Sequence, residues 1–328
     1  MHLIYFETSA LNYLIKNVSH ESLLGTREYQ RTKNVEFVLS PVSLWEVLLS
    51  KDDNIGDEIV FYAQQVFSEK LLASPSEMVV RYLTNAYPEN KTNYRIDSIG
   101  EFAETWKRLA NDSTKRFIVD PEELRKSAHH VRLISKNIRK IIIGDQGELQ
   151  SDFLISLKNV IDTYYEVMKE EGVYDSRVKK NGYNEEIYYK LAILFVLLIL
   201  VLRIDIVRDS DLQEFISSLP IDTDNPTAYL IYLFESYDQI FYIGPIAEMV
   251  MMAYHQVQLN KPNRGLIFDC YHNLYAPYVN YILTADQVFS ELTDNVEHYS
   301  TRIAHISEIG LREVINWDEW YNRDREPL

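Results

Sequence analysis

Glycine and cysteine are scarce in this sequence, and each scarcity excludes a class of protein. With 10 glycines among 328 residues, the chain has no glycine-rich loop of the kind that cradles nucleotide phosphates. Cys270 is the single cysteine, which excludes an internal disulfide, and no cysteines and histidines have the spacing of a zinc site. A single thiol fits a reducing compartment, and the first residues lack the basic and apolar regions of a secretion signal. We therefore expect a cytoplasmic protein.

The sequence also lacks a positive net charge and an apolar run of membrane-spanning length. The unbroken apolar run from Leu191 to Leu202 has twelve residues, which as a helix would extend about 18 Å, short of the ~30 Å hydrocarbon core. We expect a helix buried on all sides and no membrane partner, and a membrane span is the less favoured alternative. The net charge of −16 argues against a nucleic-acid binder with a wholly basic surface. It leaves room for an acidic metal site with a local basic track.

The sequence does contain four acidic residues, two near each end, that follow short apolar runs. Such runs, bounded by turn-forming residues, are typical of buried strands. Parallel sheets bind ligands beyond the carboxyl ends of their strands, so we expect the four carboxylates to converge in one cleft. Like charges that close together either bind cations or shift their pKa values. The runs are 3–6, 35–39, 266–268 and 281–283, and the acidic residues are Glu7, Glu46, Asp269 and Asp286.

The order and spacing of these residues resemble a PIN-type nuclease domain. That family has an acidic residue followed by Thr-Ser after its first strand, and a Glu in the helix after its second strand. A later acidic residue opens a helix, and an Asp follows a Thr at the end of a further strand. Glu7-Thr8-Ser9, Glu46, Asp269 and Thr284-Ala285-Asp286 fill these positions. The resemblance covers residues 1–50 and 240–310 approximately, and it departs from the family at Glu7, where Asp is usual.

The resemblance implies a fold, a cofactor and a reaction. It implies a PIN-like parallel sheet flanked by helices, and hydrolysis of phosphodiester bonds in nucleic acid, with single-stranded RNA as the expected substrate. Mg²⁺ or Mn²⁺ would lower the pKa of a bound water and neutralise charge on the phosphate. The implied ligands are Glu7, Glu46, Asp269 and Asp286, with Thr8, Ser9 and Thr284 orienting them.

The middle of the chain, from about residue 56 to 240, is mostly helical in pattern. We therefore expect a discontinuous α/β domain made of residues 1–55 and 240–328, with an all-helical insertion at 56–239. The predicted helices of this middle region lie near 56–72, 76–87, 98–111, 121–143, 149–171, 185–203, 210–218 and 226–238.

Positive charge is concentrated in residues 105–140, which hold ten Lys or Arg and four acidic residues. Their net charge of +6 leaves −22 for the rest of the chain. In the helix predicted at 129–143, isoleucine and valine share one side at helical spacing and basic residues share the other. This basic face is either an ordinary solvated surface or a track for nucleic-acid phosphates. Its members are Arg132, Lys136, Arg139 and Lys140.

Each acidic residue also has a structural interpretation. Glu7, Asp269 and Asp286 each precede a predicted helix and are suited to cap it. Glu46 lies inside an apolar stretch, so its carboxylate either faces solvent or enters a polar site.

Two functions other than an active nuclease also stay open. One is a catalytically weak or inactive PIN fold that binds proteins through its helical insertion. The other is a nuclease silenced by an inhibitory protein partner, as in toxin–antitoxin pairs or phage-defence systems.

Overall fold

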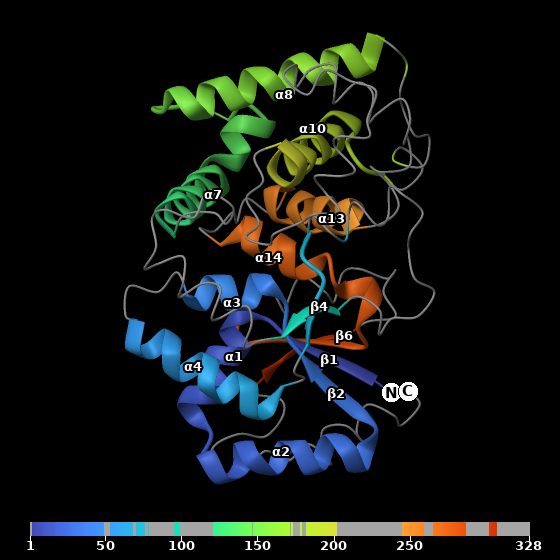
Figure 1. Ribbon diagram of the computed structural model, residues 1–328. Coiled ribbons are helices and arrows are strands. Elements are labelled where there is room, and N and C mark those ends of the chain that lie inside the picture. The colour runs from blue at the N-terminus through green and yellow to red at the C-terminus, as the bar shows by residue number, and fades with distance from the viewer. Residues whose placement is uncertain are drawn as a thin grey trace. The chain divides into compact units, whose positions relative to one another are not determined.

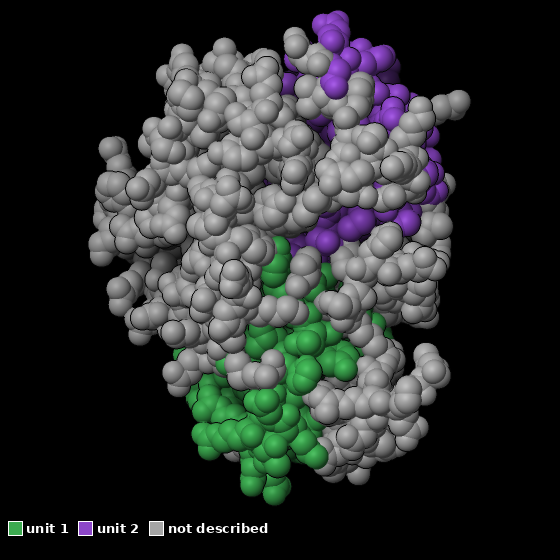
Figure 2. All heavy atoms as spheres, turned by 90° about the vertical axis from the view of Figure 1, so that its right-hand side faces the viewer, with its two compact units in different colours: residues 1–74, 88–116, 275–328 green, residues 75–87, 117–274 purple. Residues whose placement is uncertain are grey.

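A computed structural model of the protein shows a mixed α/β architecture, mostly helical, with one four-stranded parallel sheet (Figure 1). The chain divides into two compact units, which Figure 2 distinguishes by colour. The first unit comprises residues 1–74, 88–116 and 275–328, and the second comprises 75–87 and 117–274. The structure describes residues 2–48, 53–67, 70–75, 78, 95–98, 121–145, 147–170, 172, 178, 182–201, 245–258, 265–286 and 302–306.

The parallel sheet belongs to the first unit and has the strand order β2-β1-β5-β6. All three neighbouring pairs are parallel, and Ile4 lies opposite both Phe37 and Tyr281 in the register. The predicted strands at 3–6, 35–39 and 281–283 are confirmed. The fourth strand was not predicted, because its Arg-Ile-Ala-His sequence is no continuous apolar run. The strands are β1 (His2–Phe6), β2 (Val35–Val38), β5 (Tyr281–Thr284) and β6 (Arg302–His305).

This strand order places a topological switch point between β1 and β5. From β1 the chain continues to β2 on one side, and from β5 it continues to β6 on the other. In open parallel sheets, ligands bind at such a point, outside the carboxyl ends of the strands. Glu7 directly follows β1, and Ala285 and Asp286 directly follow β5. The fold therefore brings two of the predicted acidic positions to the edge of the sheet where ligand sites form.

The first unit also has four described helices, of which two follow β1 and two follow β2 along the chain. Asn34 is the C-cap of helix α2, and its φ of 56° is left-handed, a conformation that asparagine tolerates well at a helix end. From α2, Arg27 donates to the Gln64 carbonyl (2.6 Å) and Gln30 donates to the Val66 carbonyl (2.7 Å), which satisfies acceptors at the end of α4. The helices are α1 (Thr8–Asn17), α2 (His20–Lys33), α3 (Pro41–Leu48) and α4 (Asp53–Val66).

A pair of short strands and a short 3₁₀ helix complete the regular elements in the described part of the first unit. Strands β3 (Lys70–Leu72) and β4 (Arg95–Ser98) form an antiparallel pair, and the Leu72 amide donates to the Leu39 carbonyl, 2.9 Å away. A short 3₁₀ helix, η4 (Ala276–Tyr278), precedes β5. The Tyr275 hydroxyl donates to the Ala73 carbonyl (2.7 Å), which ties the approach to β5 to the segment after β3.

All the regular elements in the described residues of the second unit are helices. The predicted helices at 121–143, 149–171 and 185–203 are confirmed, the last as an α-helix that continues as a π-helix. Side chains from Leu191 to Ile199 are all buried, as expected for a helix enclosed on all sides. No helix in the described ranges is long and apolar enough to cross a membrane. The elements are α7 (Pro121–Ile142), α8 (Asp152–Glu170), α10 (Glu185–Val196), η2 (Leu197–Val201), α13 (Pro245–Gln258) and α14 (Leu266–Asn273).

The bounds of the two units differ from the division predicted at residues 55 and 240. Residues 56–74 belong to the first unit, since α4 packs against α1, α2 and α3. Residues 240–274 belong to the second unit, where α13 packs against α10 and α14 packs against α7. The predicted helices at 76–87, 98–111, 210–218 and 226–238 lie almost entirely outside the described residues.

The prediction of a strand at Leu266–Phe268 is wrong. These residues form the first turn of α14, which continues to Asn273. A short apolar run has the same pattern in a buried strand and in a buried helix, so periodicity does not separate them. The Ile267 amide donates to the Ser135 hydroxyl of α7 (3.2 Å), which satisfies a first-turn donor that a helix itself leaves open. Asp269 therefore lies within the first turn and not after a strand.

Candidate functional site

Glu7 is the N-cap of α1. Its Oε2 accepts from the Ser9 amide (2.8 Å), and its Oε1 accepts from the Ala10 amide (3.1 Å) and the Ser9 hydroxyl. The side chain is buried, with 7% of the residue exposed. An N-cap of this kind stabilises a helix by about 1 kcal/mol. The structural interpretation of Glu7 as a helix cap is therefore confirmed, and any further role has to coexist with it.

Glu7 and Ser9 also join the ends of β1 and β5. The Ala285 amide donates to the Ser9 hydroxyl (2.8 Å) and to Glu7 Oε1 (3.3 Å), and the Glu7 amide donates to the Leu283 carbonyl (3.1 Å). A carboxylate has about four acceptor positions. Within the described part of the chain, Oε1 receives three donors and Oε2 receives one. Oε2 is thus the less occupied of the two oxygens, and a ligand of Glu7 would bind there.

Glu46 lies on α3 and is held by the residue next to Glu7. The Thr8 hydroxyl donates to Glu46 Oε2 (2.5 Å), and Thr8 Oγ1 lies 3.5 Å from the Ser43 carbonyl oxygen. Glu46 is half-buried. Of the two interpretations of a carboxylate inside an apolar stretch, the structure favours the one that directs it to a polar site.

A buried group of hydroxyls fixes α3 against β1. The Tyr5 hydroxyl lies 2.7 Å from Ser40 Oγ and 3.1 Å from Ser43 Oγ, and Ser43 donates to the Phe6 carbonyl (3.0 Å). Burial raises the pKa of Tyr5 far above its usual value, so its phenol stays protonated and able to donate. This group sets the position from which Glu46 reaches Thr8.

Asp286 is the second residue after β5, and its backbone is held by neighbouring polar groups. Its amide donates to the Thr284 hydroxyl (2.9 Å), and Ser9 Oγ lies 3.4 Å from the same oxygen. The Ala285 carbonyl oxygen lies 3.0 Å from His305 Nε2 at the end of β6. His305 was not predicted from the sequence. The signal that could have found it is its place at the end of a short strand, similar to the positions of Glu7 and Asp286 after their strands. The helix predicted after Asp286 lies outside the described residues.

Asp269 belongs to the second unit, in α14. Its convergence with Glu7, Glu46 and Asp286, which lie in the first unit, stays a prediction. The suggested cap of a helix beginning at Cys270 is wrong, because α14 begins at Leu266 and its N-cap is Gly265. Burial, with the Asp269 charge next to it, raises the pKa of the Cys270 thiol. Cys270 is buried and free, so it is a poor nucleophile, as expected.

The oxygen atoms at and around Glu7 suit a hard cation as ligands, since they belong to carboxylate and hydroxyl groups. Within the described ranges, no group of three or more His, Cys, Asp or Glu side chains is placed to hold one metal ion. Mg²⁺ usually keeps several waters and takes only one or two carboxylates from a protein. The carboxylates of Glu7 and Glu46 are ligands of the type that such an ion takes.

The predicted basic face of α7 divides into two parts. The isoleucine side is confirmed, since Ile134, Ile138 and Ile141 are fully buried. Arg132 and Lys136 are exposed, which a phosphate contact requires.

Arg139 and Lys140 have structural partners at the end of α7. Arg139 forms an ion pair with Asp145 (2.6 Å) and donates to the Val257 carbonyl near the end of α13. Lys140 Nζ lies 3.5 Å from the Glu148 carbonyl oxygen. These two side chains therefore hold the chain after α7 and are less suited than Arg132 and Lys136 to bind a ligand.

Comparison of the chain with protein-family models, curated proteins and solved structures gave no match. The PIN-type resemblance accordingly depends on the motif residues alone.

Proposed function

We propose that the protein is a divalent-cation-dependent nuclease with a PIN-like fold, and that its site lies at the carboxyl edge of the parallel sheet. One observation carries the proposal. Glu7 and Asp286 follow the two strands on either side of the switch point, and Thr8, next to Glu7, binds the carboxylate of Glu46. Carboxylates at a switch point are placed where α/β sheets bind ligands.

The proposed chemistry is hydrolysis of phosphodiester bonds, with single-stranded RNA as the substrate. A bound Mg²⁺ or Mn²⁺ would supply an activated water and neutralise charge on the phosphate. Glu7, Glu46 and Asp286 would hold the ion directly or through water, and Asp269 is the proposed fourth carboxylate. Thr8 orients Glu46, Ser9 orients Glu7, and Thr284 fixes the backbone of Asp286.

Phosphates of the substrate would bind the exposed basic residues of α7, Arg132 and Lys136. Both side chains are donors without acceptor groups, which suits them to phosphate oxygens. The reaction would take place in the cytoplasm, in agreement with a single, buried and free cysteine.

The second candidate is a binding module that keeps the fold without the chemistry. Glu7 favours it, because that carboxylate caps α1 and joins β1 to β5, which are structural tasks. An inhibitory protein partner would be compatible with either candidate.

Cleavage assays with matched variants separate the two. Wild-type protein with Mn²⁺ should cut single-stranded RNA and lose activity with chelator. Asp286→Asn and Glu46→Gln should each lower the rate at least about tenfold, and Asp269→Asn tests the fourth carboxylate. Glu58→Gln is the control, an exposed carboxylate on α4 of the same unit. Intact RNA and DNA substrates with wild-type protein would favour the binding module, and equal rates in all variants would indicate a contaminating nuclease.

A further inference from the structure

The peptide that joins Ala285 to Asp286 is held at both of its polar atoms. Its carbonyl oxygen lies 3.0 Å from His305 Nε2, and its amide nitrogen lies 2.9 Å from Thr284 Oγ1. A carbonyl oxygen only accepts, so His305 Nε2 carries the hydrogen and donates it. The preceding amide, that of Ala285, donates to Ser9 Oγ (2.8 Å). Side chains from α1, β5 and β6 thus fix two successive peptide units.

The register of the sheet puts His305 in this position. β6 runs parallel to β5 with His305 opposite Thr284, so both residues end their strands at the same edge. Ile303 and Ala304 are buried, which anchors the strand, and His305 is half-buried. Nε2 carries a hydrogen in the imidazolium and in one neutral tautomer, so the contact does not depend on ionisation.

We propose that His305 is a positioning residue for the cation site, which rests on the proposed function. Asp286 lies beyond the last residue of β5, where hydrogen bonds within the strand no longer set the direction of the chain. By holding the Ala285 carbonyl, His305 fixes the peptide plane from which the Asp286 side chain departs. Groups that orient a metal-binding carboxylate in this way are commonly worth 10–100-fold in metal affinity.

Two substitutions of the same chemistry test the proposal, His305→Gln and His305→Asn. The glutamine amide nitrogen reaches about as far as Nε2, whereas the asparagine nitrogen is one methylene shorter. Neither amide titrates, so ionisation does not differ between them. Two quantities are measured. Electron paramagnetic resonance of the free ion gives the Mn²⁺ affinity, and thermal unfolding of the chelator-treated protein gives its Tm. His305→Gln should bind Mn²⁺ nearly as well as wild type, and His305→Asn about tenfold more weakly at an unchanged Tm.

Three other outcomes would contradict either the role of His305 or the proposed function. Equal Mn²⁺ affinities in all three proteins would overturn the role of His305 and leave the proposed function intact. An asparagine variant whose Tm falls together with its affinity would overturn it too, because His305 would then support the fold and not the site. Wild-type protein that binds no Mn²⁺ would overturn the proposed function, and the role of His305 with it.

Discussion

The Thr8 hydroxyl donates a hydrogen bond to the Glu46 carboxylate, with 2.5 Å between Oγ1 and Oε2. Thr8 opens α1 directly after β1, and Glu46 lies on α3 after β2. This contact joins the two acidic positions from the first part of the chain, since Glu7 precedes Thr8. The orientation of the Glu46 carboxylate therefore depends on the residue that follows Glu7.

Thr8→Val should weaken Mn²⁺ binding and slow RNA cleavage, each about tenfold, because Glu46 loses the donor that orients it. Stability should fall by no more than about 1 kcal/mol, since the half-buried carboxylate regains water. Thr8→Ser keeps the hydroxyl and is the control. Wild-type Mn²⁺ affinity in Thr8→Val would show that the contact is structural only.

Glu7→Ala should lower the free energy of unfolding by about 1 kcal/mol in chelator, because α1 loses its N-cap. Glu7→Asp should retain most of the stability, since aspartate is a favoured cap. Urea denaturation measures both, with exposed Glu58→Ala as the control. Unchanged stability in Glu7→Ala would mean that the cap contributes nothing, and the carboxylate would then serve the site alone.

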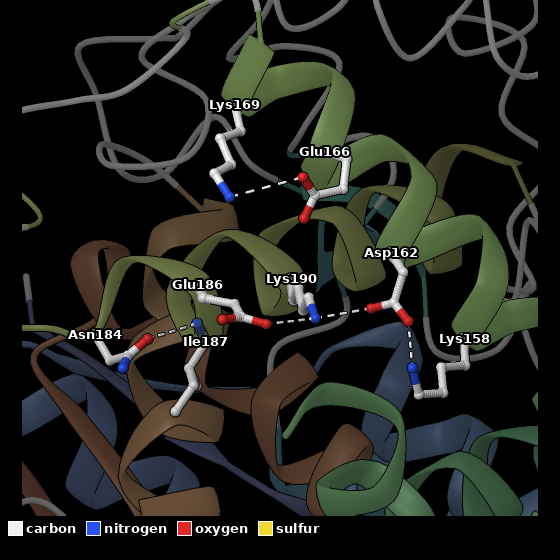
Figure 3. Close-up of polar contacts among 8 residues, drawn as sticks. All are labelled: Lys158, Asp162, Glu166, Lys169, Asn184, Glu186, Ile187 and Lys190. Carbon is white, nitrogen blue, oxygen red and sulfur yellow. Dashed lines mark hydrogen bonds and ion pairs between the residues drawn. The ribbon is translucent and has the colours of Figure 1, made fainter. Parts of the chain in front are cut away.

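Lys190 should matter for the stability of the helical unit. Its ammonium lies between the carboxylates of Asp162 (2.8 Å) and Glu186 (2.7 Å), whereas Lys169 and Glu166 form an exposed pair at 3.7 Å (Figure 3). The ammonium also lies 5.4 Å from the centre of the Tyr165 ring. Lys190→Met should destabilise the protein by about 1–3 kcal/mol. Lys169→Met, the control, should change stability by less than about 0.5 kcal/mol.

The effect of Lys190→Met on stability should depend on pH. Burial alone would raise the pKa of Asp162, but hydrogen bonds from Lys158 and Lys190, with their charges, hold it below its usual value. A lowered carboxyl pKa stabilises the fold above the unfolded value and ceases to do so as pH falls through the folded one. The difference between wild type and variant should therefore shrink below about pH 4. A difference of the same size for Lys169→Met would contradict the assignment.

The burial of Glu248 should make the free energy of unfolding fall as pH rises. Burial raises its pKa to about 8, and its Oε2 has no hydrogen-bond partner in the described part of the chain. An unfolded glutamate has a pKa near 4.3, so between about pH 5 and 8 the folded state keeps a proton that the unfolded state has released. The free energy of unfolding should fall over that range, by at most about 1.4 kcal/mol per pH unit, and level off above it.

Glu248→Gln should remove this slope, because the amide does not titrate. Denaturant unfolding of both proteins between pH 5 and 8 measures it. Glu166→Gln, at an exposed position on α8, should leave the slope unchanged. A constant difference between wild type and Glu248→Gln over this range would show that Glu248 titrates normally.

The two parts of the basic face of α7 should respond differently to charge reversal. Arg132→Glu with Lys136→Glu should weaken RNA binding at unchanged stability, because both residues are exposed and glutamate is a good helix former. The slope of log K against log salt should flatten by up to about 0.7 per lost phosphate contact. Arg139→Glu should instead lower stability, since it breaks the contacts with Asp145 and Val257. A salt titration in an Asp286→Asn background measures binding while sparing the substrate. Equal salt slopes for wild type and the double variant would mean that the basic face of α7 is only solvated surface.

Local patterns in the sequence predicted the parts of the fold that depend on local forces. The apolar runs that became β1, β2 and β5 are bounded by turn-forming residues, so their burial follows from composition alone. Helix α7 was predictable because its isoleucines repeat at helical spacing. The cap at Glu7 was predictable as one of two interpretations, since a carboxylate before Thr-Ser suits a helix start.

Tertiary structure decided which of these parts meet. A pattern of burial does not determine which element a segment packs against, and similar apolar runs became a strand at Leu3–Phe6 and a helical turn at Leu266–Phe268. The contact between Glu7 and Ala285 depends on β1 pairing with β5, and that of His305 depends on the register of β6. These pairings close loops of many residues, so they form only when packing of the whole unit outweighs the lost chain entropy. For that reason the sequence alone located Glu7 and Asp286 beside their strands, while the sheet order placed them at one switch point and added His305 next to them.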